Sequence, residues 1–124
     1  MRHVDETVLA ANDAFYRAFN DRDIEAMDAL WALEAPVWCV HPGWNMLTGR
    51  DEVMQSWRAI LSNPAQERIV AGGASVLVRG ELAIVTCREL VSGNPLAATN
   101  AFVRENGDWK LVQHHSSPVA RMDT

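Results

Sequence analysis

Two histidines are the side chains of this sequence best suited to proton transfer near neutral pH. His41 ends a short β-rich run just before Pro42, and His115 lies near the end of the last such run. An imidazole titrates near neutral pH without the help of burial, so we take His41 as the candidate general base. His115 is its candidate partner, which would polarise a substrate oxygen through an N–H group. The alternatives, in which His41 only hydrogen-bonds loop backbone and His115 is a structural residue, stay open.

Alternation along the last β-rich run decides which side chains would accompany His115. Successive side chains of a strand point to opposite faces. One face then carries Trp109, Leu111, Gln113, His115 and Ser117. We predict that this face lies inside because it holds the bulky apolar members, and that His114 lies outside. Gln113 and His115 would then need partners or a ligand in the interior.

Sulfur and metal chemistry have less support in the sequence. Cys39 and Cys87 lie in apolar runs and do not form a CxxC pair, so we expect two buried free thiols. A nucleophilic role for Cys39 would need a cationic or helix-terminal neighbour. His41 and His115 would need a third ligand to hold a metal ion, and the spacing indicates none. We therefore expect neither a metal nor a cofactor.

Local patterns predict three helices and five strands. Apolar residues at helical spacing predict helices over residues 4–20, 24–33 and 50–61. β-rich runs predict strands over residues 37–41, 67–79, 82–91, 96–105 and 109–116. Asp23 is suited to cap the second helix. Gly72-Gly73 indicates a bulge in the first long strand, and Asn106-Gly107 is a strong hairpin signal.

The order of these segments predicts the fold class. Strands that follow one another through tight turns are antiparallel, and helices gathered toward one end of the chain make the class α+β. No repeat, linker or low-complexity segment interrupts the 124 residues. We therefore expect a single domain over residues 1–124.

Three segments, taken in order, match a known pattern. Residues 15–27 join an aromatic helix to a short N-x-x-D turn, and residues 40–50 combine a strand, a proline turn and a Gly-Arg pair. Residues 106–117 carry a Trp, alternating apolar residues and an H-x-S ending. Together they resemble the SnoaL-like family of the nuclear-transport-factor-2-like superfamily, relatives of ketosteroid isomerases and polyketide cyclases. The resemblance implies a cone-shaped fold in which three N-terminal helices pack on a curved antiparallel sheet and enclose a pocket.

The resemblance also implies roles for single residues. His41 stands where the ketosteroid-isomerase relatives carry a general-base aspartate. Their oxyanion hole pairs a tyrosine with a protonated aspartic acid, and those two positions fall here on Phe15, next to Tyr16, and on Ala101. We therefore do not expect ketosteroid isomerisation. On the strand before the last, the resemblance places Thr99, Ala101 and Val103 inward, and Asn100 and Phe102 outward.

Two functional hypotheses follow. In the first, the chain is a SnoaL-like domain that binds a small organic ligand in an apolar, histidine-containing pocket without a complete catalytic constellation. The expected ligand contacts are Tyr16, Trp44, Trp57 and Gln113. In the second, the chain is a small lyase, isomerase or cyclase in which His41 acts as general base on a carbonyl-containing substrate. His115, Gln113 and Tyr16 would then orient that substrate.

Charge and hydropathy limit the expected partners. The net charge is −5, the isoelectric point is about 5.2, and the 11 Lys and Arg residues are scattered, whereas nucleic-acid binding needs a basic surface. No apolar run approaches the roughly 20 residues of a membrane-spanning helix, and the first residues lack the apolar core of a secretory signal. We expect no nucleic-acid or membrane partner and a cytoplasmic location. The family resemblance implies a homodimer packed through the convex sheet face.

Overall fold

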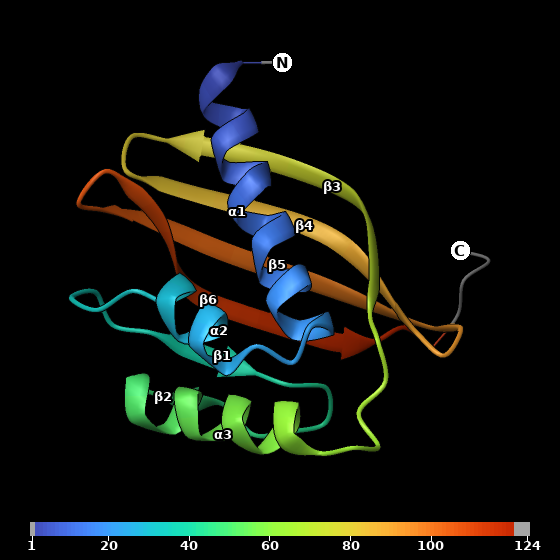
Figure 1. Ribbon diagram of the computed structural model, residues 1–124. Helices are drawn as coiled ribbons and strands as arrows, with labels where there is room; N and C mark the ends of the chain where they lie inside the picture. The colour runs from blue at the N-terminus through green and yellow to red at the C-terminus, as the bar shows by residue number, and fades with distance from the viewer. Residues whose placement is uncertain (1, 121–124) are drawn as a thin grey trace.

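Three helices and six strands form the regular structure of residues 2–120, the part of the chain that this computed structural model describes. The helices are α1 (His3–Asn20), α2 (Ile24–Leu30) and α3 (Arg50–Ser62). The strands are β1 (Trp38–Val40), β2 (Leu47–Thr48), β3 (Val70–Arg79), β4 (Leu82–Val91), β5 (Asn94–Glu105) and β6 (Asp108–Pro118). All three helices precede the long strands (Figure 1), and the prediction of an α+β class is confirmed.

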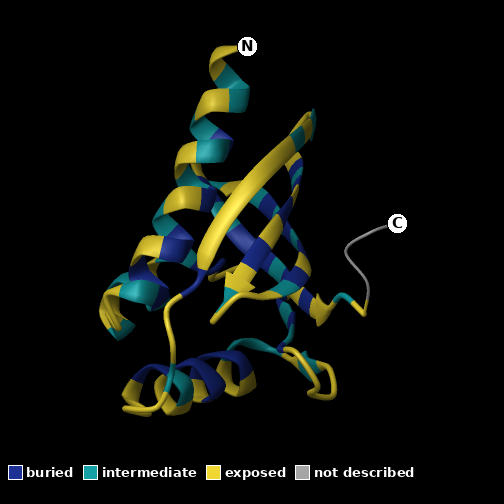
Figure 2. Cartoon of the chain, turned by 90° about the vertical axis from the view of Figure 1, so that its right-hand side faces the viewer, coloured by how far each residue is buried: buried dark blue, intermediate teal, exposed yellow. Residues whose placement is uncertain are grey.

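The six strands form one sheet in the order β2-β1-β6-β5-β4-β3. β1 runs parallel to β6, and every other pair of neighbours is antiparallel. The helix α1 lies across one face of the long strands, which we call the inner face, and the opposite, outer face carries no helix among the described residues (Figures 1 and 2). The parallel pairing places Val40 beside His115. It therefore brings the segment that leads into His41 to the last strand.

Aromatic packing joins α1 to both the sheet and α3. The buried side chains Val8, Phe15, Ala18 and Phe19 recur along one side of α1, which Figure 2 shows as the dark side of the helix toward the strands. Phe15 and Phe19 both contact Trp57 of α3, with ring centroids 5.6 and 6.0 Å apart. Burying one such side chain contributes roughly 1.5–3 kcal/mol. These contacts hold α3 against α1, beside the edge of the sheet that β1 and β2 form (Figure 1).

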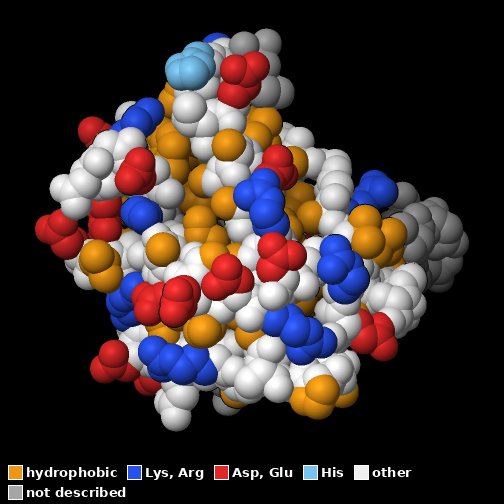
Figure 3. Space-filling view, in the orientation of Figure 1, with side chains coloured by type: hydrophobic (Ala, Val, Ile, Leu, Met, Phe, Trp, Pro, Cys, Tyr) orange, Lys and Arg blue, Asp and Glu red, His pale blue; other side chains and the backbone are white. Residues whose placement is uncertain are grey.

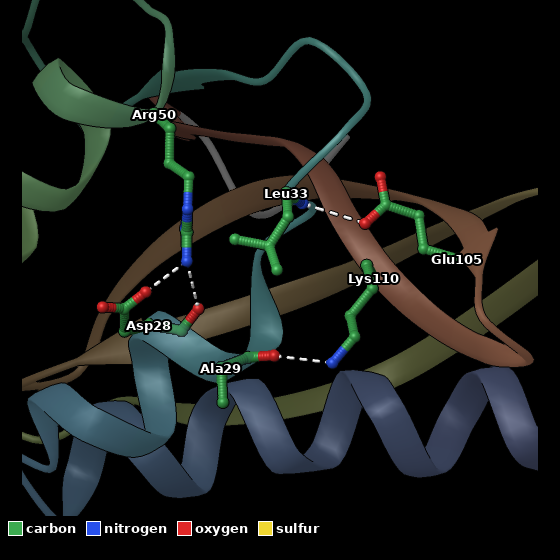
Figure 4. A network of polar contacts seen from close by, with 6 residues as sticks. All are labelled: Asp28, Ala29, Leu33, Arg50, Glu105 and Lys110. Atoms are coloured by element: carbon green, nitrogen blue, oxygen red, sulfur yellow. Dashed lines mark hydrogen bonds and ion pairs between the residues drawn. The ribbon is translucent and has the colours of Figure 1, made fainter.

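The short helix α2 is held at both ends by polar contacts. The side chain of Asp23 accepts a hydrogen bond from Ala26 N at 3.0 Å, which confirms the predicted cap. The helix ends at Leu30, three residues earlier than predicted, because Trp31 leaves it to pair with β6. Figure 4 shows the side chains that fix this end: Arg50 pairs with Asp28, Lys110 donates to Ala29 O, and Glu105 accepts from Leu33 N.

The predicted bulge in the first long strand is present. The register between β3 and β4 shifts between Gly72 and Ser75, and Gly73 adopts a φ of 65°. Glycine reaches this left-handed conformation without the steric cost of a Cβ atom. The strand itself begins at Val70, later than the predicted residue 67.

A second bulge, in β6, was not predicted, and it reverses the faces of the strand. Ala101 pairs with Gln113 and Phe102 with Leu111, so Val112 has no residue opposite it. The inner face therefore carries Trp109, Leu111, His114 and Ser116, and the outer face carries Gln113, His115 and Ser117. The prediction was correct for Trp109 and Leu111 and wrong for Gln113, His115 and Ser117. It was also wrong on β5, where Asn100 and Phe102 point inward and Thr99, Ala101 and Val103 point outward.

The surface that carries α1 has charges of both signs. Acidic and basic side chains lie interspersed over this side of the molecule, with no continuous stripe of either sign (Figure 3). Within residues 2–120, no helix has the length and apolar character needed to cross a membrane.

Candidate functional site

A cavity of about 560 Å³ lies where α1 ends, beside α3 and the ends of β4 and β6. We call it the site cavity. Its apolar wall is formed by Phe19, Trp57, Ile60, Ile69, Val91 and Leu96. Three titratable side chains also line it, each from a different part of the fold: His41 after β1, Glu89 on β4 and His114 on β6. All three are buried, with 4%, 1% and 3% of their surface exposed.

His41 is held as a neutral imidazole with a defined tautomer. The hydroxyl of Ser56 donates its only hydrogen to Val53 O at 2.6 Å, and its oxygen lies 2.9 Å from His41 Nε2. Nε2 therefore carries the hydrogen and donates to Ser56, which leaves a lone pair on Nδ1. Burial lowers the pKa of His41 to about 4. At neutral pH the side chain is thus an uncharged hydrogen-bond acceptor, but its pKa of about 4 makes it a weaker base than the near-neutral imidazole expected from the sequence.

His114 has its tautomer set by a chain of side-chain amides. Asn100 Nδ2 donates to Asn12 Oδ1 at 2.8 Å and to Tyr16 Oη at 3.1 Å. This orientation leaves Asn100 Oδ1 as an acceptor 2.6 Å from His114 Nδ1, so Nδ1 carries the hydrogen and Nε2 the lone pair. Burial, and then the neighbouring His41 and His115, lower the pKa of His114 to about 3. His114 is therefore also neutral.

Glu89 receives hydrogen bonds on both carboxylate oxygens. Tyr16 donates to Oε2 at 2.5 Å, and Ser116 donates to Oε1 at 2.7 Å. The pKa of Tyr16 is raised by burial and, in addition, by the nearby Glu89 and Cys87. Its hydroxyl therefore keeps the proton that it donates. Tyr16 also accepts from Asn100, and through these two residues the carboxylate is linked to His114.

Aromatic rings surround His41. Trp57 lies edge-on to the imidazole at 4.7 Å between ring centroids, and Trp44 at 4.8 Å. The ring of His114 lies 6.4 Å from that of His41 and 5.9 Å from that of Trp57. Trp57 is 1% exposed, whereas Trp44 is 47% exposed. Trp57 therefore forms the floor of the site cavity and Trp44 stands at its opening.

The structure brings four of the six proposed site residues to this region. His41, Trp44 and Trp57 line the site cavity, and Tyr16 lies directly behind Glu89. His115 and Gln113 do not belong to it, because the Val112 bulge turns both to the outer face. His41 and His115 therefore do not share a pocket, and the histidine that accompanies His41 is His114.

Three polar residues of the site were missed from the sequence. Glu89 is not among the predicted site residues, although strict alternation from Ala83 through Val85 and Cys87 places it inside. That alternation is visible in the sequence and would have identified Glu89. His114 was missed because no local signal indicates the β6 bulge that turns it inward, and Asn100 was missed because the family resemblance placed it on the outward side of its strand. The inward β5 residue beside Tyr16 is accordingly Asn100, and not Ala101.

Cysteine and metal chemistry find little support at the site. Cys39 and Cys87 are buried and form no disulfide, as expected. Burial raises the pKa of the Cys39 thiol, which lies 3.7 Å from His41 Nε2 and stays protonated. Among residues 2–120, no three His, Cys, Asp or Glu side chains are grouped so that they could hold a metal ion.

Comparison with known proteins gives several full-length similarities. A protein of Streptomyces avermitilis, solved as a "putative dehydratase from the NTF2-like family", has 36% sequence identity and a TM-score of 0.90, over 95% of this chain and 97% of that one. A "putative calcium/calmodulin-dependent protein kinase type II association domain" of Thiobacillus denitrificans has 32% identity and a TM-score of 0.81, over 91% and 95% of the two chains.

A plant protein shares the same domain within a longer chain. The F-box protein SKIP8 of Arabidopsis thaliana is 30% identical over 112 residues, which are 89% of this chain and 48% of that protein. The chain thus spans about half the length of this curated relative. A family model, the SnoaL-like domain, matches residues 8–121. The chain therefore belongs to the SnoaL-like family of the nuclear-transport-factor-2-like superfamily.

Proposed function

We propose that the protein binds a small, largely apolar organic molecule in the site cavity. The observation that carries this proposal is the cavity itself: about 560 Å³, with apolar walls on which His41, Glu89 and His114 converge. Pockets for small molecules usually combine such walls with a few placed polar groups. The neutral imidazoles each offer one lone pair, so they would orient a ligand that donates hydrogen bonds.

A cavity-filling substitution tests this proposal. Ile60 lines the site cavity, and Ile60→Trp would occupy its volume. Ile84 is a matched control because it lies on the outer face of β4, and Ile84→Trp would leave the cavity open. With 2-naphthylmethanol as a neutral probe, we expect saturable binding by calorimetry to the unchanged protein and to Ile84→Trp. Binding to Ile60→Trp should be at least about tenfold weaker. Equal binding to both variants would place the ligand elsewhere and contradict the proposal.

A second candidate function is a lyase- or isomerase-type proton transfer with His41 as base. The observation that favours it is the position of the neutral His41 imidazole in the lining of the site cavity, and the name of the Streptomyces avermitilis structure points in the same direction. Exchange of the α-hydrogens of a cavity-binding ketone with D₂O, followed by NMR, reports such a transfer directly. His41→Gln should slow this exchange by about 100-fold or more. Equal rates for both proteins would leave ligand binding as the function.

A further inference from the structure

Glu89 is a buried carboxylate that has no cationic partner in its surroundings. It is 1% exposed and lines the site cavity. No Lys or Arg lines that cavity within residues 2–120. The adjacent Arg88 is exposed on the opposite face of β4. The only ion pairs formed by described residues are those of His3 with Glu6 and of Arg50 with Asp28, and neither involves Glu89.

The hydrogen bonds around Glu89 are those of a charged carboxylate. Tyr16 and Ser116 each direct a hydroxyl hydrogen to one of its oxygens, and Asn100 in turn donates to Tyr16. Both carboxylate oxygens of Glu89 therefore act as hydrogen-bond acceptors. The two imidazoles of the cavity add no positive charge, because burial keeps His41 and His114 neutral.

This arrangement leaves a negative charge uncompensated in a poorly solvated place. Taking a charge out of water is costly unless a charge of opposite sign accompanies it. The lone pairs on His41 Nδ1 and His114 Nε2 reinforce the acceptor character of the same region. An anionic ligand would find no cation in the described lining, only neutral donors such as the unpartnered Trp57 Nε1–H, whereas a cation would supply the missing counter-charge. Trp57 and Trp44 add aromatic surface, which also attracts cations.

We propose that the site cavity selects ligands that carry a protonated amine, with the ammonium group donating to Glu89 and the apolar body lying against Trp57, Phe19 and Leu96. This inference rests on the proposed ligand-binding function and names the ligand class. It also excludes carboxylates and phosphates of similar size as preferred occupants.

Three probes that share one ring system test the charge preference. The probes are 2-naphthylmethylamine, 2-naphthylmethanol and 2-naphthoate, titrated into the unchanged protein at pH 7 by calorimetry. We expect the amine to bind at least about tenfold more tightly than the alcohol, because hydrogen bonds to charged groups are stronger than neutral ones. The carboxylate should bind at least about tenfold more weakly than the alcohol. This ranking needs no variant and therefore does not depend on any substitution being tolerated.

A charge-removing substitution assigns the preference to Glu89. Glu89→Gln keeps the size of the side chain and removes its charge, so the ratio of amine affinity to alcohol affinity should fall to less than about threefold. Glu81→Gln, in the exposed turn before β4, is the matched control and should keep the full preference.

The possible failures can be told apart. If the alcohol binds but the carboxylate binds as well as the amine, ligand binding stands and the amine inference is wrong. The same conclusion follows if Glu89→Gln retains the preference. If none of the three probes binds, both the proposed function and this inference fail.

Discussion

His114 and His115 are neighbours in sequence, yet they meet opposite environments. His114 is 3% exposed and bonded to Asn100, whereas His115 is exposed on the outer face. The first is therefore part of a hydrogen-bonded interior in which charge is penalised, and the second remains solvated. This pair makes it possible to change a buried and an exposed histidine at adjacent positions of one strand.

The buried histidines predict how stability depends on pH. An unfolded histidine has a pKa of about 6.5, whereas His41 and His114 are held at about 4 and about 3. Below pH 6.5 the unfolded chain takes up protons that the folded chain does not. The free energy of unfolding should therefore be highest above pH 6.5 and fall as the pH falls toward about 4, by about 1.4 kcal/mol per pH unit for each histidine. Urea denaturation between pH 7 and pH 5 measures this slope.

Removing either buried histidine tests the origin of that slope. His114→Gln removes one of the two groups and should reduce the slope by about half, whatever its effect on stability at pH 7. His41→Gln removes the other group and should reduce the slope by a similar amount. An unchanged slope in His114→Gln would mean that the buried imidazole takes up its proton without unfolding.

At the scale of elements, local signals were sufficient for most boundaries. The Asp23 cap, the glycine bulge near Gly73 and the Asn106-Gly107 turn were predicted because each depends on residues adjacent in sequence. β4 was predicted as residues 82–91, the range that the structure shows. His41 was placed correctly on the cavity side because its position depends only on the short strand before it and the proline after it.

The β6 bulge is the feature that local patterns could not predict. Val112 is a buried β-branched residue of a type common in strands, so no glycine marks the interruption at this position. Next to the extra residue, Leu111 pairs with Phe102 of β5 on one side and with Trp31 on the other. Both are tertiary partners far away in sequence. An alternation argument that begins at Trp109 is therefore right for two inward residues and wrong for the rest of the strand.

At the scale of the whole molecule, the outer face of the sheet carries no helix among the described residues. Half-exposed apolar side chains lie along it, among them Ile84, Ala101 and Val103. Thr86, Thr99 and His115 form a row across its centre. The homodimer that the family resemblance implies would cover this face, and it stays a prediction.

Oligomeric state in solution tests that prediction. We expect light scattering coupled to size-exclusion chromatography to give a mass near twice the 13.8 kDa of one chain. Thr99→Arg introduces a charge at the centre of the outer face, and burying it in an interface would be costly, so the variant should be monomeric. Ala10→Arg, on the exposed side of α1, should remain dimeric. A monomeric mass for the unchanged protein would contradict the prediction.

The Val112 bulge has a consequence for anyone who aligns relatives of this protein. Two homologous strands that differ by one residue at this point look equally good when aligned without a gap, because no glycine or proline marks the position of the extra residue. From the bulge onward, such an alignment pairs His114 with a residue that lies on the opposite face of the relative's strand. It would then indicate wrongly whether the relative has a histidine in its cavity. Only an alignment that places the gap at Val112 matches equivalent positions.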